Sequence, residues 1–198
     1  MPILPLRMDQ QTRDLFEVTL SETQSRMLAS TPDGISIELV EHLGESEYGT
    51  IVRISETLVN HFGHNARFNR NSIKKYFNYP KTLPFVIRYK KEIEGFIVGA
   101  PIENFAKEPW AQFDENLGKG NTIYTYAYVV KKDRRNLGIA KMLKRVYQNT
   151  LRRKGYLYMT GHVMEGVSLN FTKKSHVVRK FDNWNNTGYT FEYYRCPL

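Results

Sequence analysis

The chain has 198 residues, is 41% hydrophobic and carries a formal net charge of +9, so it is long enough to bury one substantial core. No apolar run approaches the roughly 20 residues of a membrane-spanning helix, and the first residues lack the regions of a signal peptide. The only cysteine, Cys196, excludes a disulfide framework and a Cys-x-x-Cys metal or redox site. We therefore expect one cytoplasmic catalytic or binding domain.

Residues 1–34 are expected to form an N-terminal extension to a domain that spans residues 35–198. Within the extension, the pattern over residues 12–28 favours a helix that ends before the turn at residues 31–34. Residues 35–42 then alternate apolar and polar side chains, which is typical of a strand with one buried face.

The next elements are two helices and a hairpin. Apolar residues at helical spacing predict a helix that ends near Gly63, and a short helix follows over residues 72–77. Residues 83–89 and 93–100 resemble two strands joined by a tight turn, and a polar insertion over residues 103–121 follows them.

The clearest part of the sequence is a buried strand followed by an amphipathic helix. Residues 123–130 are β-branched or aromatic on both faces, as expected of a strand covered on both sides. The helix that follows ends near Gly155. One helical face holds the apolar residues Ile139, Met142, Leu143, Val146, Tyr147, Thr150 and Leu151, and basic residues fill the other face.

The junction between this strand and this helix has the properties of an anion site. A helix N-terminus presents N–H groups without intrahelical partners, and its dipole favours negative charge. Gly138 lets a phosphate approach the backbone, Ala140 keeps the next turn small, and Arg134 and Arg135 supply cationic donors. The junction therefore suits a diphosphate, although a solvated turn would have the same composition.

The spacing Arg135-x-x-Gly138-x-Ala140 resembles motif A of the GCN5-related N-acetyltransferases, which binds the pyrophosphate of acetyl-coenzyme A (acetyl-CoA). The resemblance implies an α/β fold with a mixed, mostly antiparallel central sheet, helices on both faces, and a splay between the fourth and fifth strands. A final helix over residues 169–181 and a last strand over residues 189–195 complete the expected order of elements.

The resemblance also implies which residues bind the coenzyme. The fourth strand (residues 123–130) would present backbone groups to the pantetheine arm, and the junction would hold the pyrophosphate. Residues at the end of the fifth strand (expected over residues 156–162) and after it would contact the remainder. The implied residues are Tyr128, Val129, Val130, Lys131, Arg134, Arg135, Asn136, Leu137, Gly138, Ile139, Ala140, His162, Asn170 and Lys173.

The resemblance implies transfer of an acetyl, or similar short acyl, group from acetyl-CoA to an amine. The amine would attack the thioester directly, which calls for a base and an acid. The fourth strand has no carboxylate, so Glu103 and Glu165 are the candidate bases, with His162 as a third; for either glutamate, a surface charge is the favoured alternative. The expected final helix has no tyrosine, and three tyrosines of the last strand are alternatives for the acid. Tyr189 is taken as the candidate, with Tyr193 and Tyr194 beside it.

The charge is distributed unevenly, because residues 131–198 hold 15 Lys and Arg but 4 Asp and Glu. This excess suits coenzyme phosphates and would also suit nucleic acid. The basic aromatic segment 67–79, with Phe105, Trp110 and Phe113, is expected to shape an acceptor pocket for a small-molecule or peptide amine.

The alternatives are a nucleic-acid-binding module without catalysis and a domain that binds acyl-CoA without turnover. Nucleic acid and membrane are not expected as partners. A metal is not expected either, since His61 and His64 have no third ligand nearby in the sequence. The oligomeric state is left open, with a homodimer as one option.

Overall fold

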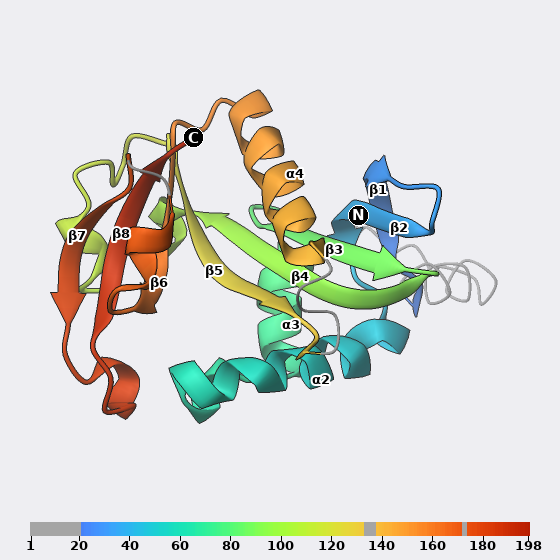
Figure 1. The fold of residues 1–198 in the computed structure, drawn as a ribbon, viewed down its shortest axis with the longest axis horizontal. Helices are drawn as coiled ribbons and strands as arrows, with labels where there is room; N and C mark the ends of the chain where they lie inside the picture. The colour runs from blue at the N-terminus through green and yellow to red at the C-terminus, as the bar shows by residue number, and fades with distance from the viewer. Residues whose placement is uncertain (1–20, 133–137, 172–173) are drawn as a thin grey trace, which may run out of the picture.

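Eight strands form a single mixed sheet in the order β1-β2-β3-β4-β5-β6-β8-β7 (Figure 1). The computed structural model describes residues 21–132, 138–171 and 174–198. Neighbouring strands are antiparallel except for β5 and β6, so the expected mixed, mostly antiparallel sheet is confirmed. The strands are β1 (Gln24–Ser30), β2 (Ile35–His42), β3 (Leu83–Tyr89), β4 (Glu92–Pro101), β5 (Thr122–Val130), β6 (Tyr158–Met164), β7 (His176–Phe181) and β8 (Phe191–Pro197).

Helices cover both faces of this sheet (Figure 1). Helices α2 (Glu45–Phe62) and α3 (Arg70–Phe77) pack on one face, and α4 (Ile139–Arg153) packs on the other. Most of the apolar face predicted for α4 is buried, with Met142 and Val146 partly buried, and each fully buried Leu contributes roughly 1.5–3 kcal/mol of transfer free energy. Within the described ranges, no helix has the length and apolarity needed to cross a membrane.

The predicted hairpin of β3 and β4 is confirmed, and its turn has an unusual composition. Lys90 and Lys91 have φ angles of 48° and 76°, so both central residues are left-handed, as a type I′ turn requires. Such turns favour Asn and Gly because a Cβ makes the left-handed region unfavourable. The antiparallel register of the two strands therefore holds the lysines in this conformation.

The helix predicted over residues 12–28 is wrong over residues 24–28, although residue 21 is helical. Residues 24–30 form strand β1, which pairs antiparallel with β2, and residues 12–20 lie outside the described ranges. The pairing is reinforced by Ser25, whose hydroxyl donates to the carboxylate of Glu38 on β2 at 2.8 Å. The sheet therefore includes residues before the boundary expected at residue 35.

The helix predicted over residues 169–181 is also wrong. A short 3-10 turn (Val167–Asn170) and strand β7 occupy the described part of this range, and β7 pairs antiparallel with β8. Between β7 and β8, Asn183 and Gly188 have φ angles of 48° and 77°. Such left-handed residues let the chain reverse direction, so a hairpin replaces the helix.

Strands β5 and β6 separate soon after they meet. Their parallel pairing is limited to residues 122–124 of β5 and 158–160 of β6, although both strands continue beyond it. Figure 1 shows the two strands diverging from this point. On its other side, β5 pairs with β4 but shifts register next to Tyr126, so Tyr126 has no partner residue on β4 and forms a β-bulge.

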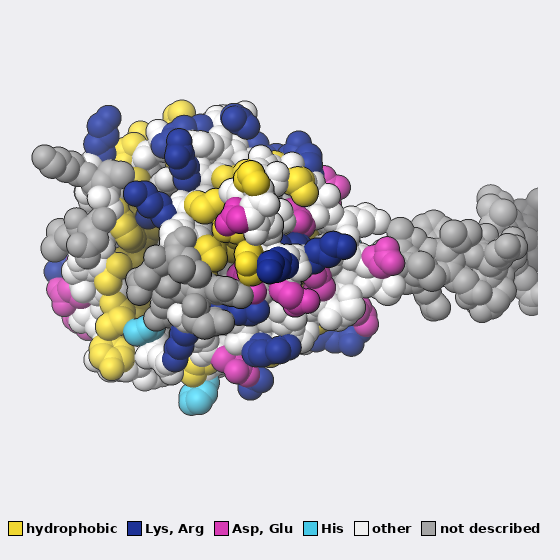
Figure 2. All heavy atoms as spheres, turned by 45° about the vertical axis from the view of Figure 1, so that its right-hand side comes forward, with side chains coloured by type: hydrophobic (Ala, Val, Ile, Leu, Met, Phe, Trp, Pro, Cys, Tyr) yellow, Lys and Arg dark blue, Asp and Glu magenta, His cyan; other side chains and the backbone are white. Residues whose placement is uncertain are grey.

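The surface charge bears on the nucleic-acid alternative. On the face shown in Figure 2, Lys and Arg side chains are interspersed with Asp and Glu. Several cations are paired with carboxylates, including Arg88 with Glu38 and Lys180 with Glu165. Paired cations neutralise fewer phosphates, and the described side chains visible in Figure 2 do not form the uninterrupted basic stripe that favours a nucleic-acid backbone.

Candidate active site

A cavity of about 680 Å³ lies where β5 and β6 diverge. Its walls include residues 124–128 of β5 and residues 161–163 of β6. Some lining residues, such as Tyr147, belong to the core under α4, and others, such as Tyr76, belong to the core under α2 and α3. The cavity therefore reaches both faces of the sheet at the point where strand pairing stops.

The α4 side of the cavity contains the described part of the predicted anion site. Gly138 has a φ of +73° at the N-cap of α4, and a Cβ placed there would meet no atom within 4 Å. The first turn of α4 has no acidic residue, so no carboxylate of that turn would repel an anion at the positive end of the helix dipole. Four predicted pyrophosphate ligands, Arg134, Arg135, Asn136 and Leu137, lie outside the described residues, as does Lys173.

Tyr128 connects β5 to the start of α4. Its hydroxyl donates to the carbonyl oxygen of Ala140 at 2.6 Å, and its ring lines the cavity. Burial raises the pKa of Tyr128 to about 12, so the hydroxyl keeps its proton and remains a donor. This hydrogen bond fixes the distance between the edge of β5 and the N-terminus of α4. The resemblance implies that both bind the same ligand, acetyl-CoA.

The other predicted strand residues face different surroundings. Val129 and Val130 are buried, so they can offer a ligand only their backbone. The N–H of Lys131 donates to the carbonyl oxygen of Glu94 at 2.8 Å, and its ammonium lies 3.4 Å from the Glu94 carboxylate. The side chain of Ile139 is buried in the core under α4, where it anchors the first turn.

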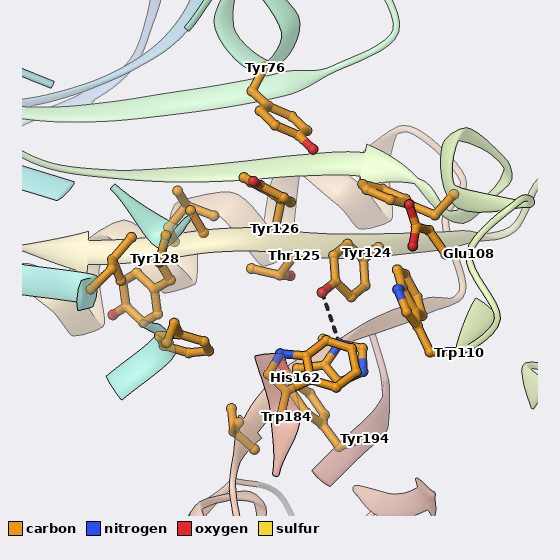
Figure 3. Close-up of a pocket in the computed structure, with 18 of the residues that line it drawn as sticks. Tyr76, Glu108, Trp110, Tyr124, Thr125, Tyr126, Tyr128, His162, Trp184 and Tyr194 are labelled. Atoms are coloured by element: carbon orange, nitrogen blue, oxygen red, sulfur yellow. Dashed lines mark hydrogen bonds between the residues drawn. The ribbon is translucent and has the colours of Figure 1, made fainter. Parts of the chain in front are cut away.

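His162 lies inside the cavity wall on β6. Its Nδ1 is 2.9 Å from the hydroxyl of Tyr124 on β5, and this contact bridges the two diverging strands (Figure 3). Burial lowers the pKa of His162 to about 3, so the imidazole is neutral near pH 7 and is a weak base. Burial also raises the pKa of Tyr124, so the phenol keeps its proton and donates to Nδ1 in the His162 tautomer that leaves Nδ1 unprotonated.

The predicted catalytic residues Glu103, Glu165 and Tyr189 do not line the cavity. Glu103 accepts hydrogen bonds from the N–H groups of Gly118 and Gly120 at 3.2 and 2.9 Å, which closes the insertion loop on itself. Glu165 forms an exposed ion pair with Lys180 at 2.6 Å. Tyr189 is 49% exposed and precedes β8. Their positions favour structural or surface roles over contact with a thioester in this cavity.

Two other ionisable residues, one carboxylate and one phenol, do line the cavity. Glu108 is the one carboxylate among the described residues that line the cavity, and it comes from the insertion before β5. Tyr194 of β8 lines the cavity and packs against the ring of Phe171 at 4.9 Å. Burial raises the pKa of Tyr194, which keeps its hydroxyl protonated.

Tyr193 has a different role from its neighbour Tyr194. Its hydroxyl donates to Asp114 at 2.7 Å, and Asp114 also pairs with Arg195 at 2.9 Å in a buried cluster. Alternation along β8 places the two tyrosines in different cores, which is a signal that the sequence already contains. Glu108 has no comparable signal, because nothing local distinguishes it from a surface glutamate.

Comparisons with known proteins agree with this geometry. Residues 52–174 match the Acetyltransferase (GNAT) family. A search of curated protein sequences finds no significant match. Three solved structures with the same fold are a GCN5-related N-acetyltransferase from Kribbella flavida, NAA60 of Arabidopsis thaliana in complex with acetyl-CoA, and a ribosomal-protein-alanine N-acetyltransferase from Brucella melitensis.

The structural likeness covers nearly all of each relative. The Kribbella protein is 11% identical with a TM-score of 0.61, and the match covers 85% of this chain and 100% of that one. The Arabidopsis protein is 14% identical with a TM-score of 0.60, with coverages of 83% and 99%. The Brucella protein is 11% identical with a TM-score of 0.59, with coverages of 79% and 98%.

At these identities the structures show a shared fold, whereas the sequence match over residues 52–174 spans more than half of the chain and shows the family. The chain belongs to the Acetyltransferase (GNAT) family and is an acetyl-CoA-dependent acyltransferase.

Proposed function

We propose that the enzyme transfers the acetyl group of acetyl-CoA to a small-molecule or peptide amine in the cavity between β5 and β6. The main support is that this cavity reaches both faces of the sheet where strand pairing ends. A thioester entering from the α4 side and an amine entering from the α2 and α3 side would meet at the edge of β5.

The coenzyme would bind along β5 and the start of α4. The pyrophosphate would meet the N–H groups at Gly138 and Ala140, together with Arg134, Arg135, Asn136 and Leu137. Backbone groups of residues 128–130 would bind the pantetheine arm. Asn170 and Lys173 remain proposed contacts for the rest of the coenzyme, and His162 is reassigned to holding Tyr124 in place.

In the proposed reaction, the amine nitrogen attacks the thioester carbon. A C–N bond forms, the C–S bond breaks, and the proton lost by the amine ends on the coenzyme thiolate. Backbone N–H groups around the bulge at Tyr126 would stabilise the oxyanion, since such donors act strongly where water is excluded. Tyr194 would donate a hydrogen bond to the leaving sulfur.

Glu108 would take the proton from the amine, directly or through water. Replacing it by Gln, Glu108→Gln, keeps the shape and removes the charge, so we expect kcat to fall by about 10²–10⁴-fold. Release of free coenzyme thiol would report turnover, and an acetyl-CoA thermal shift would show that coenzyme binding is retained.

Glu165→Gln is the matched control, because Glu165 is an exposed glutamate outside the cavity wall. We expect it to keep its activity. Full activity in Glu108→Gln together with loss of activity in Glu165→Gln would contradict the assignment and return the base to Glu165.

A further inference from the structure

The side of the cavity under α2 and α3 is built from aromatic rings (Figure 3). They come from α3, from the insertion after β4, from β5 and from the turn between β7 and β8. We call this set the aromatic wall: Tyr76, Phe105, Trp110, Tyr124, Tyr126 and Trp184. Residues so far apart in sequence share one surface because each packs against its neighbours.

Ring contacts hold the aromatic wall in place. Tyr76 stacks on Tyr126 with centroids 3.7 Å apart and planes 19° apart. Trp110 lies against Tyr124 at 4.5 Å, and Trp184 stacks on the imidazole of His162 at 4.0 Å. Each stacked ring has one face covered by its partner, so a ligand can meet only the ring surfaces that line the cavity, and paired rings lose few rotamers when it binds.

The charges around the wall are few. Glu108 is the one acidic residue among the described lining residues, and Figure 3 places it beside Tyr124 and Trp110. Two lysines also line the cavity. Lys75 lies over the ring of Tyr76 at 5.0 Å, and Lys144 lies over Phe171 on the α4 side at 4.2 Å. The single carboxylate of Glu108 can pair with an acceptor that carries one ammonium group, whereas a polyamine would present several ammonium groups.

We infer that the acceptor is a small primary amine with one ammonium group on a short aliphatic chain attached to an aromatic body. Aromatic faces bind such a body by stacking and attract its ammonium by cation–π interaction. The cavity of about 680 Å³ must also hold the thioester end of the coenzyme, which leaves room for a compact acceptor. This inference rests on the proposed function and narrows its acceptor.

The first test compares acceptors with the unmodified enzyme. Phenethylamine, hexylamine, spermidine, phenylalanine and a peptide with a free N-terminal methionine would be assayed for acetylation by mass spectrometry. We expect phenethylamine to have a kcat/KM at least about tenfold above each of the others, as expected from the stacking energy of an aromatic body.

The outcomes separate the two claims. Preference for spermidine, phenylalanine or the peptide would overturn the aromatic-amine inference and leave amine acetylation intact. Comparable rates with phenethylamine and hexylamine would overturn it as well, because the rings would then add no selectivity. Acetylation of no amine by enzyme that binds acetyl-CoA would overturn both the inference and the proposed function.

The second test removes one ring of the wall. Trp184→Leu should lower kcat/KM for phenethylamine about tenfold and lower that for hexylamine much less, because only the aromatic acceptor loses a stacking surface. Tyr79→Leu is the control, since Tyr79 is 48% exposed and does not line the cavity. If Trp184→Leu keeps its fold and its acetyl-CoA thermal shift but lowers kcat/KM equally for phenethylamine and hexylamine, the inference is overturned.

Discussion

Gly138 combines a left-handed backbone with open space at the start of α4. Replacing it by Asp places a negative charge where the pyrophosphate is proposed to bind. We expect acetyl-CoA affinity, measured by calorimetry, to fall at least about tenfold, or roughly 1.4 kcal/mol. Gly138→Asn is the matched control, because Asn has nearly the same shape, tolerates the left-handed region and carries no charge. Equal affinities of the Asp and Asn variants would place the pyrophosphate elsewhere.

Tyr194 and Tyr193 allow a second comparison at single-residue scale. Tyr194→Phe keeps the ring in its core and removes the proposed donor to the sulfur, so we expect turnover to fall by about 10²-fold or more. Tyr193→Phe removes the donor to Asp114, and we expect it to lower the free energy of unfolding by about 1–3 kcal/mol. Turnover per folded molecule should remain. Full turnover of the Tyr194 variant would remove it from the reaction.

At the scale of elements, a buried ion pair fastens the insertion before β5 to strand β8. The side chains of Asp114 and Arg195 are 0% and 6% exposed, and they pair at 2.9 Å. Glu115 also pairs with Arg195. The insertion carries Glu108 and Trp110, so this pair positions part of the cavity wall.

Breaking this pair should therefore cost stability. Asp114→Asn removes the buried counter-charge of Arg195 and leaves it the exposed Glu115, and we expect the free energy of unfolding to fall by up to about 3–5 kcal/mol. Urea denaturation would measure it. The exposed pair of Glu165 and Lys180 gives the comparison, since Glu165→Gln should change stability by about 1 kcal/mol or less. Similar losses in the two variants would show that Asp114 is not a structural anchor.

The elements that sequence predicted well are those whose pattern is local. Helix α4 and the β3–β4 hairpin carry complete periodic signals within themselves, so their neighbours are not needed to recognise them. The two elements predicted wrongly as helices, β1 and β7, are the edge strands of the sheet. An edge strand is largely exposed and pairs on one side, so its conformation depends on the partner strand more than on its own pattern.

At the scale of the whole molecule, the candidate site also divides into a part with a local sequence pattern and a part that only the fold assembles. The anion site proposed at the start of α4 is contiguous in sequence, so its spacing alone is enough to propose it. The proposed acceptor side is assembled from Tyr76, Glu108, Tyr126 and Trp184, which lie on α3, in the insertion after β4, on β5 and in the turn between β7 and β8. Glu103 and Glu165 were chosen for their nearness to strand ends in sequence, and their side chains are engaged elsewhere.

The measurement that tests the account most directly is the unfolding of the protein with and without acetyl-CoA. A ligand that binds only the folded state at about a hundred times its dissociation constant adds about 2.7 kcal/mol to the free energy of unfolding. We predict a gain of this size and a rise in Tm with acetyl-CoA. An unchanged Tm at millimolar acetyl-CoA, in protein shown to be folded, would contradict the account.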